Sequence, residues 1–226
     1  MMRGALRPVI TGREIKFGAA LQGYTLAPAP TVLHNDNGPA QSQGYLLNDT
    51  LSDCVVVSAL RYCQRWDASF IPTDDMARQI FGYFGSPDIG LDPFAFADDW
   101  AAGKLPVLPK IAGWVQLDLS DATQLTQAIT LTKGAMLCAA LAQQAENQFP
   151  APWVIRTLGD PGQDLHCFFT DGFDQSNPDA LFDRITWGDY MRDGINLAFL
   201  AEFGFAGIAA IRDQAMMDKL REIAAL

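Results

Sequence analysis

The sequence of 226 residues predicts an α+β domain, in which a helical half comes first and an antiparallel sheet later. Between residues 54 and 134, apolar side chains recur mostly at the spacing of amphipathic helices. After residue 135 the apolar runs become short and are separated by Gly, Pro and Asn turns, as strands are. Apolar residues make up 49% of the chain and charged residues 19%, which is enough apolar material for a sizeable core. Helices followed by strands are typical of the α+β class.

The expected helices of the first half have recognisable starts. Ser52 or Asp53 can cap the first one, Pro93 stands at the first helical position of the third, and Ser120 can cap the fourth. These helices are expected at residues 54–66, 73–84, 92–102 and 120–134. Strands are expected at residues 135–142, 165–170, 180–187 and 205–211, with further helices at 189–203 and 213–226.

Residues 1–45 differ from the rest because they show neither helical nor strand periodicity. They contain a polar turn around His34, which we interpret as solvated, and the prolines Pro8, Pro28, Pro30 and Pro39. We therefore divide the chain into an extended N-terminal arm (residues 1–45), an α+β domain (46–212) and a C-terminal helix (213–226). The arm is expected to wrap the domain or to reach a neighbouring subunit.

The charge pattern argues against binding to nucleic acids. The formal net charge is -10, and the 16 basic residues are scattered, whereas phosphate binding depends on clustered Lys and Arg. No apolar run approaches the roughly 20 residues that a membrane span requires, and the first residues lack the apolar segment of a signal peptide. We expect no membrane span and no signal peptide.

The cysteines and histidines do not form a metal-binding pattern. None of the four cysteines (Cys54, Cys63, Cys138 and Cys167) belongs to a C-x-x-C pair, and the chain has only two histidines. Each cysteine lies in an apolar segment, as reduced core cysteines do. We expect free thiols, no metal and no cofactor.

Cys54 stands where a nucleophilic cysteine would. A helix amino terminus stabilises a thiolate through its unpaired N–H groups, and a nearby imidazolium does so more strongly. Asn48, six residues upstream, can donate a hydrogen bond to an oxyanion beside the Cys54 N–H. His166 opens an apolar strand far along the chain and can act as the base, and Trp187 can cover its ring. The alternative is a purely structural role, in which Cys54 is an inert core cysteine and His166 is a core histidine.

The order and spacing of these segments resemble those of the papain-like cysteine peptidases. The segments are Asn48 followed by Cys54, His166 followed by Gly172-Phe173-Asp174, and Thr186-Trp187-Gly188. The sequence is more closely similar to papain-like proteins of bacteriophages and prophages, most of them uncharacterised, over residues 12–212. The resemblance implies a Cys-bearing helix packed on an antiparallel sheet that bears the His. It implies Cys54 as nucleophile, His166 as general base and acid, Asn48 as oxyanion donor in place of the usual Gln, and Trp187 as the cover of the histidine.

The sequence departs from that pattern at the residue that should orient the imidazole. Papain-like enzymes place Asn there, and the matching residue is Ile185. Thr186 or Asp183 is a candidate replacement, although strand alternation puts Thr186 on the opposite face from Ile185. Ser52 and Asp164-Leu165 also stand where glycines are usual.

Two functions follow as hypotheses. The first is a phage-encoded thiol hydrolase of amide bonds, in a protein or a peptidoglycan peptide, that uses a Cys-His dyad. The second is a catalytically decayed papain-like fold that serves as a structural protein of a phage particle, in its capsid or tail, and contacts neighbouring virion subunits through the arm. A binding module that uses the cleft without cleavage lies between them. The expected location is the virion or the cytoplasm of the bacterial host.

Overall fold

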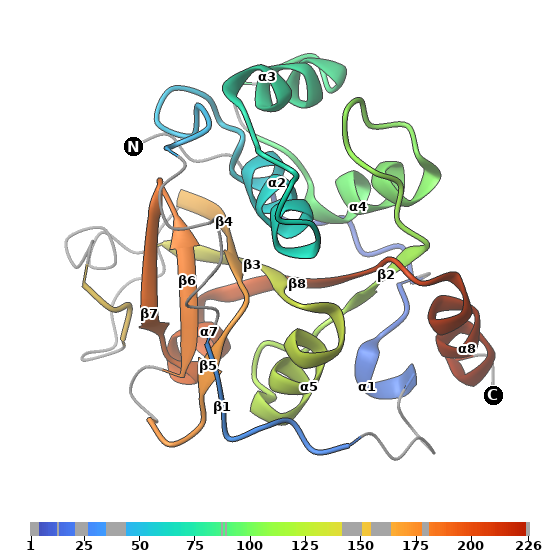
Figure 1. The fold of residues 1–226 in the computed structure, drawn as a ribbon, viewed down its shortest axis with the longest axis vertical. Coiled ribbons are helices and arrows are strands. Elements are labelled where there is room, and N and C mark those ends of the chain that lie inside the picture. The colour runs from blue at the N-terminus through green and yellow to red at the C-terminus, as the bar shows by residue number, and fades with distance from the viewer. Residues whose placement is uncertain are drawn as a thin grey trace.

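The structure is a computed structural model that describes residues 5–12, 14–20, 27–34, 44–86, 88, 90–141, 151–154, 164–177 and 181–224. Its elements form an eight-stranded sheet with helices on both faces (Figure 1). The helices are α1 (Phe17–Ala20), α2 (Cys54–Trp66), α3 (Asp74–Tyr83), α4 (Pro93–Ala102), α5 (Ala122–Thr132), α7 (Leu197–Phe203) and α8 (Gln214–Ala224). The α+β prediction is confirmed.

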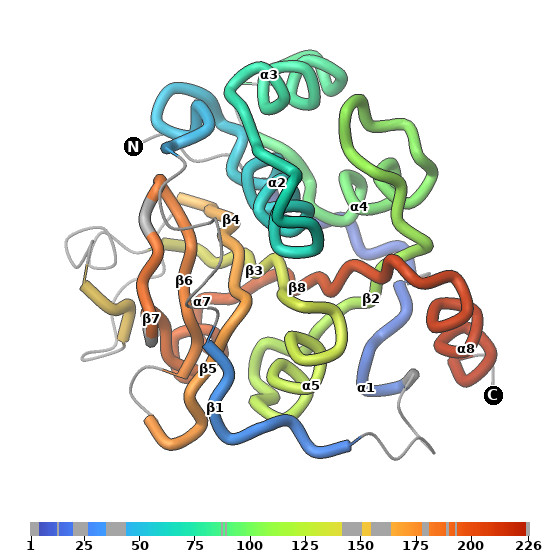
Figure 2. Tube along the Cα trace, viewed as in Figure 1, coloured from blue at the N-terminus to red at the C-terminus, as the bar shows by residue number. Residues whose placement is uncertain are grey.

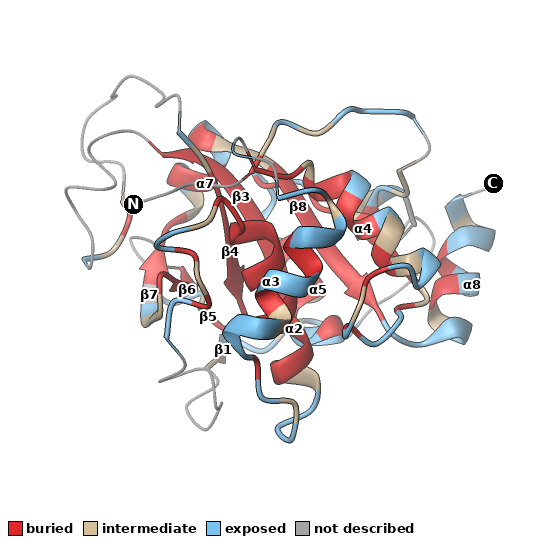
Figure 3. Ribbon diagram, turned by 90° about the horizontal axis from the view of Figure 1, so that it is seen from above, coloured by how far each residue is buried: buried red, intermediate tan, exposed pale blue. Residues whose placement is uncertain are grey.

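The strands pair antiparallel in the order β1-β5-β6-β4-β3-β8-β2, and β7 also pairs with β6. They span β1 (Val32–Leu33), β2 (Gly113–Gln116), β3 (Ala135–Leu141), β4 (Asp164–Thr170), β5 (Phe173–Asp174), β6 (Phe182–Thr186), β7 (Asp189–Ile195) and β8 (Gly204–Ile211). All seven residues of β3 are buried, as expected for a central strand covered on both faces. The apolar cluster on one face includes α2, α3 and α4, and the cluster on the other includes α5, α7 and α8, so the sheet forms the middle layer (Figure 1). Figure 3 shows the central strands as buried.

Side-chain caps fix the starts of several helices. Thr73 Oγ1 accepts a hydrogen bond from the Met76 N–H at 3.3 Å, and Asp92 Oδ1 accepts one from the Phe94 N–H at 2.8 Å. These two starts were predicted. The predicted Ser120 cap is wrong by one residue, since Asp121 caps α5 by accepting from the Gln124 N–H at 3.0 Å.

The predicted helix at residues 189–203 is wrong in its first half. Residues 189–195 form β7, which pairs with β6 through a two-residue turn, and a helix starts only after the Asn196 cap. The turn residues Trp187 and Gly188 both have positive φ, as a type I′ hairpin turn requires. Cross-strand pairing therefore outweighs the local helical pattern. The short strands β1, β2 and β5 were not predicted from the sequence.

The described parts of the arm lie on its own domain (Figure 2). Ala5 bridges Leu91 in parallel register, Lys16 bridges Gln116, and β1 pairs with β5. The division of the chain at residues 45 and 212 stays a prediction. Among the described helices, none combines the length and apolar character needed to cross a bilayer.

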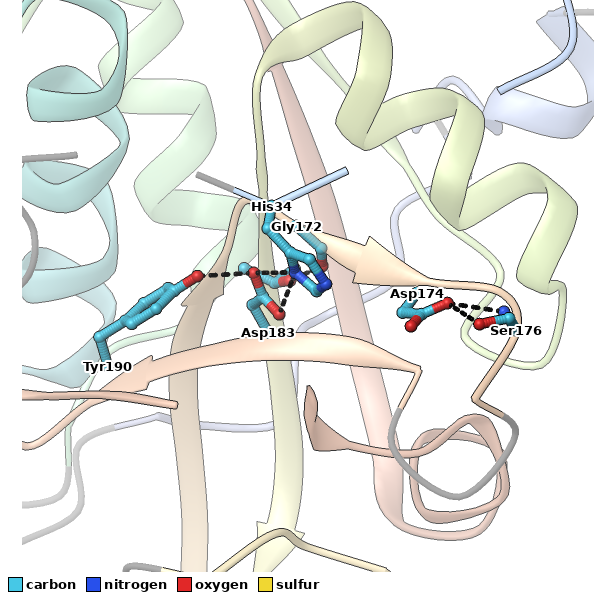
Figure 4. Close-up of polar contacts among 7 residues, drawn as sticks. His34, Gly172, Asp174, Ser176, Asp183 and Tyr190 are labelled. Carbon is cyan, nitrogen blue, oxygen red and sulfur yellow. Dashed lines mark hydrogen bonds and ion pairs between the residues drawn. The ribbon is translucent and has the colours of Figure 1, made fainter. Parts of the chain in front are cut away.

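His34 closes one of these arm contacts and is not solvated, contrary to the prediction. Its side chain is 11% exposed, and its Nδ1 lies 3.1 Å from both carboxylate oxygens of Asp183 (Figure 4). Tyr190 donates its hydroxyl hydrogen to Asp183 Oδ2 at 2.9 Å. The buried Asp183 of β6 thus connects the arm with β7, and its carboxylate binds both His34 and Tyr190.

Candidate active site

Cys54 is the first residue of α2 and has no exposed surface. The helix begins here because the Asp53 carbonyl accepts the Val57 N–H at 3.0 Å. The backbone N–H of Cys167 donates to Cys54 Sγ at 3.2 Å. The sulfur therefore lies at a helix amino terminus and beside the residue that follows His166, where both the helix dipole and the hydrogen bond favour a thiolate.

His166 lies on β4 and is also fully buried. Its Nε2 is hydrogen-bonded to the hydroxyl of Thr186 on β6 at 2.5 Å. The Trp187 ring stacks on the imidazole, with centroids 4.5 Å apart and an interplanar angle of 23°. The hairpin turn that contains Trp187 positions this ring against the imidazole, and a role for Trp187 as the cover of a catalytic histidine stays a prediction.

Thr186 meets His166 because strand alternation places the two side chains together. Ile185 is paired with Phe169 and joins the apolar cluster beneath α2, whereas the next residue points the other way. The alternation was predicted from the sequence, where the position of Thr186 on the opposite face from Ile185 argued against Thr186 as the residue that orients the imidazole. The imidazole lies on that opposite face. Asp183, the other candidate orienter, binds His34 and Tyr190.

Trp153 and Arg184, for which no role was predicted from the sequence, pack behind the imidazole. The Trp153 ring meets the imidazole edge-on at 6.4 Å, and the guanidinium of Arg184 lies 4.2 Å above the Trp153 ring. Arg184 is fully buried and donates to the Ala151 carbonyl at 3.2 Å. An arginine inside the apolar strand β6 was the available signal, because charged residues are rarely fully buried without partners.

Asn48 lies in the turn that leads to Cys54 and is 1% exposed. Its backbone N–H donates to the Tyr45 carbonyl at 3.0 Å. Its side-chain Oδ1 accepts no hydrogen bond from the described residues, although an unmet buried acceptor costs about 1–3 kcal/mol. A role for Asn48 as oxyanion donor stays a prediction.

Asp53 has an unusual position immediately before Cys54. Its side chain does not cap α2, contrary to one alternative of the sequence analysis, and Ser52, the other, donates to the Asp88 carbonyl instead. Neither carboxyl oxygen of Asp53 has a hydrogen-bond partner among the described residues. Burial raises the pKa of Asp53 to about 8, and the charges of Asp49 and Asp74 act in the same direction. The group is therefore a neutral acid at neutral pH.

The arm crosses beside this site as an extended main chain. The Ala5 N–H donates to the Leu165 carbonyl at 3.4 Å, and the Leu6 N–H donates to the Leu91 carbonyl at 2.7 Å. Leu165 precedes His166, and Leu91 immediately precedes Asp92, the cap of α4. The arm therefore connects the start of α4 with β4 at the residue that precedes His166.

No family model matches this sequence, and no curated protein is similar to it in sequence. Solved structures do match the fold. Xylellain, a cysteine protease from Xylella fastidiosa, superposes with a TM-score of 0.65 at 12% sequence identity. The match covers 93% of this chain and 96% of the xylellain chain. The digestive procathepsin L2 proteinase of the Tenebrio molitor larval midgut gives a TM-score of 0.59 at 12% identity, over 93% of this chain and 78% of its own. The chain thus has the fold of the papain-like cysteine proteases.

Proposed function

We propose that this protein is a papain-like thiol hydrolase of amide bonds, with Cys54 as nucleophile and His166 as general base and acid. The observation that carries the proposal is the convergence at residues 166–167. Cys54 Sγ accepts the N–H of Cys167, and the imidazole of the preceding residue is hydrogen-bonded to Thr186 and stacked on Trp187. These contacts support the proposal because they hold the imidazole in one orientation, one residue along the strand from the N–H that binds the Cys54 sulfur.

In the proposed reaction, His166 takes the thiol proton and the Cys54 thiolate attacks the carbonyl carbon of the amide. Because Nε2 is bonded to Thr186, the proposal uses Nδ1 for the proton exchange. The Cys54 N–H and the Asn48 amide hold the oxyanion that develops on the carbonyl oxygen. His166 then protonates the leaving amine, and a water molecule, deprotonated by His166, hydrolyses the thioester to release the acid and the thiol.

Peptides are the proposed substrate class, either in a protein or in a peptidoglycan cross-bridge of a phage host. The arm supports this class because the carbonyls of Leu91 and Leu165 already bind an extended main chain beside the site. A substrate that used the same two acceptors would replace residues 5 and 6 and place its own backbone next to Cys54.

The test is the rate of iodoacetamide alkylation of Cys54 against pH, in wild type and in His166→Ala. A thiolate–imidazolium pair gives rapid alkylation below pH 7 that is lost in the variant. Slow alkylation with an ordinary thiol profile in both proteins would contradict the proposal. Peptide and peptidoglycan libraries then identify the substrate.

The burial of the site favours a second candidate. Cys54 and His166 have no exposed surface, which suits a catalytically decayed fold that serves in the capsid or tail of a phage particle. This candidate predicts a symmetric assembly in solution and alkylation of Cys54 only after unfolding. Analytical ultracentrifugation together with the alkylation profile separates the two candidates.

A further inference from the structure

Three of the four cysteines gather on the face of the sheet that α2 covers. Cys54 comes from α2, Cys138 from β3 and Cys167 from β4, and all three are buried in the same apolar cluster. Cys63 lies more than two turns further along α2, where burial raises the pKa of its thiol to about 12. The proposed mechanism uses only Cys54, so it leaves the other two thiols of the group unexplained.

Cys138 and Cys167 are direct partners in the antiparallel pairing of β3 and β4. Residues in such pairs have Cα atoms about 4.5–5.5 Å apart, within the range of about 4.4–6.8 Å that disulfides span. Cys54 Sγ lies 3.2 Å from the backbone nitrogen of Cys167. Cys167 is therefore the strand partner of Cys138, and its backbone nitrogen contacts the sulfur of Cys54 on the helix above.

The protons of this group are distributed unequally. The pKa of Cys138 is raised well above its ordinary value, first by burial, then by a hydrogen bond with the Cys167 thiol and by the charges of Cys167 and Cys54. Cys138 consequently keeps its proton and can donate it in a hydrogen bond to the Cys167 sulfur. Such a bond directs the Cys138 S–H at the Cys167 sulfur, the atom that would attack oxidised sulfur.

We propose that Cys167 is a resolving thiol for Cys54, positioned by Cys138, and that hydrogen peroxide converts Cys54 and Cys167 into a reversible disulfide. In the first step the Cys54 thiolate attacks one peroxide oxygen, the O–O bond breaks, and Cys54 sulfenic acid and hydroxide form. In the second step the Cys167 sulfur attacks the sulfenic sulfur, the S–O bond breaks, and the departing hydroxide takes up the proton of the Cys167 thiol to leave as water.

The disulfide removes the nucleophile without destroying it. A sulfenic acid left alone proceeds to sulfinic and sulfonic acids, which thiols do not reduce, whereas a disulfide is reopened by dithiothreitol. The inference rests on the proposed function in one respect, because it requires Cys54 to be a thiolate. It would make the hydrolase a peroxide-sensitive enzyme that recovers when reductant returns.

Peptide mapping tests the proposal directly, because trypsin separates the four cysteines. They fall in residues 17–61, 62–65, 134–156 and 157–184. Reduced full-length protein is treated with hydrogen peroxide, alkylated with iodoacetamide, digested without reductant and analysed by mass spectrometry. We expect peptide 17–61 to be linked to peptide 157–184, and dithiothreitol to reverse the link.

Variants assign the roles. Cys167→Ser should abolish the link and make sulfinic and sulfonic Cys54 the main products, while the matched Cys63→Ser control should behave as wild type. Cys138→Ser keeps a hydroxyl donor and should form the link faster than Cys138→Ala. Equal rates in these two variants would remove Cys138 from the proposal.

The wild-type map decides the proposal even if a variant fails to fold. Sulfinic Cys54 without a link, or a link between peptides 134–156 and 157–184 with Cys54 intact, overturns it. If Cys54 of untreated protein is alkylated rapidly below pH 7 but forms no link, the hydrolase proposal stands and the resolving role fails. If Cys54 is neither alkylated nor linked, both fail.

Discussion

Thr186 and His166 are joined by a hydrogen bond of 2.5 Å between the threonine hydroxyl and imidazole Nε2. The bond connects β6 to β4, strands that are neighbours in the sheet but whose bonded residues are 20 positions apart in sequence. Because Trp187 stacks on the ring, the bond is shielded from water, which strengthens it. Under the proposed function, Thr186 is therefore the residue that positions His166 for proton exchange.

Replacing Thr186 by Val should lower the rate of Cys54 alkylation below pH 7, and any hydrolytic kcat, by about 10- to 100-fold, because the isosteric side chain lacks the hydroxyl that holds the imidazole. Thr186→Ser retains the hydroxyl and should recover most of the rate. The pH profile of alkylation provides the readout, since a purely structural defect would not shift it. A Val variant with the wild-type profile would show that Thr186 does not orient His166.

Removing residues 1–9 should expose Cys54. The truncation deletes the hydrogen bonds from Ala5 and Leu6 to the Leu165 and Leu91 carbonyls, together with the exposed bond from the Val9 N–H to Asp92 Oδ2 at 2.9 Å. The first two bonds, at about 1 kcal/mol each, predict a rise of roughly 30-fold in the alkylation rate of Cys54. A chain that lacks only residues 1–4 is the matched control and should react like the full chain. Equal rates for both truncations would mean that the arm does not restrict access.

Asp53→Asn should stabilise the protein increasingly as pH rises. The folded-state pKa of Asp53 is raised to about 8, so between pH 4 and 8 the folded protein holds a proton that the unfolded chain releases. The proton bound to folded Asp53 stabilises the protein fully below the pKa that Asp53 has in the unfolded chain. This stabilisation is lost, at about 1.4 kcal/mol per pH unit, as pH rises towards 8. Asparagine does not titrate, so the variant does not lose stability in this way.

Urea unfolding of wild type and Asp53→Asn at pH 5 and pH 8 measures the effect. The gap in free energy of unfolding between the two proteins should widen by more than about 1.4 kcal/mol over this interval. Asp75, whose side chain is 80% exposed, provides the control, and Asp75→Asn should change stability by less than about 0.5 kcal/mol at both pH values. A constant gap for Asp53→Asn would show that Asp53 is ionised throughout.

Gly172→Ala should destabilise the contact between His34 and Asp183. A Cβ at this position would lie 2.1 Å from Asp183 Oδ2 and 2.7 Å from the Leu33 carbonyl, so the arm or the carboxylate must move (Figure 4). We expect a loss of about 1–3 kcal/mol in the free energy of unfolding by urea. Gly82→Ala is the control, because nothing lies within 4 Å of its Cβ and a helical alanine gains about 0.5–1 kcal/mol. Similar changes in both variants would refute the clash.

The sequence by itself determined the features that depend on neighbouring residues. The α+β class, the helix that starts at Cys54 and the caps Thr73 and Asp92 follow from periodicity and local hydrogen bonding, which act within a few positions of the chain. The resemblance to papain-like proteins added the expected order of the key segments, and solved cysteine proteases share the fold of the chain.

Only the tertiary structure decided how those segments meet. It turned residues 189–195 into a strand, put Thr186 rather than Ile185 against His166, and buried His34 against Asp183. Each outcome depends on pairing between strands that are distant in sequence. Local periodicity does not indicate which strand will be the partner. Burial of Asp53 without a described partner belongs to the same class, because desolvation is set by the residues that cover a group rather than by its neighbours in sequence.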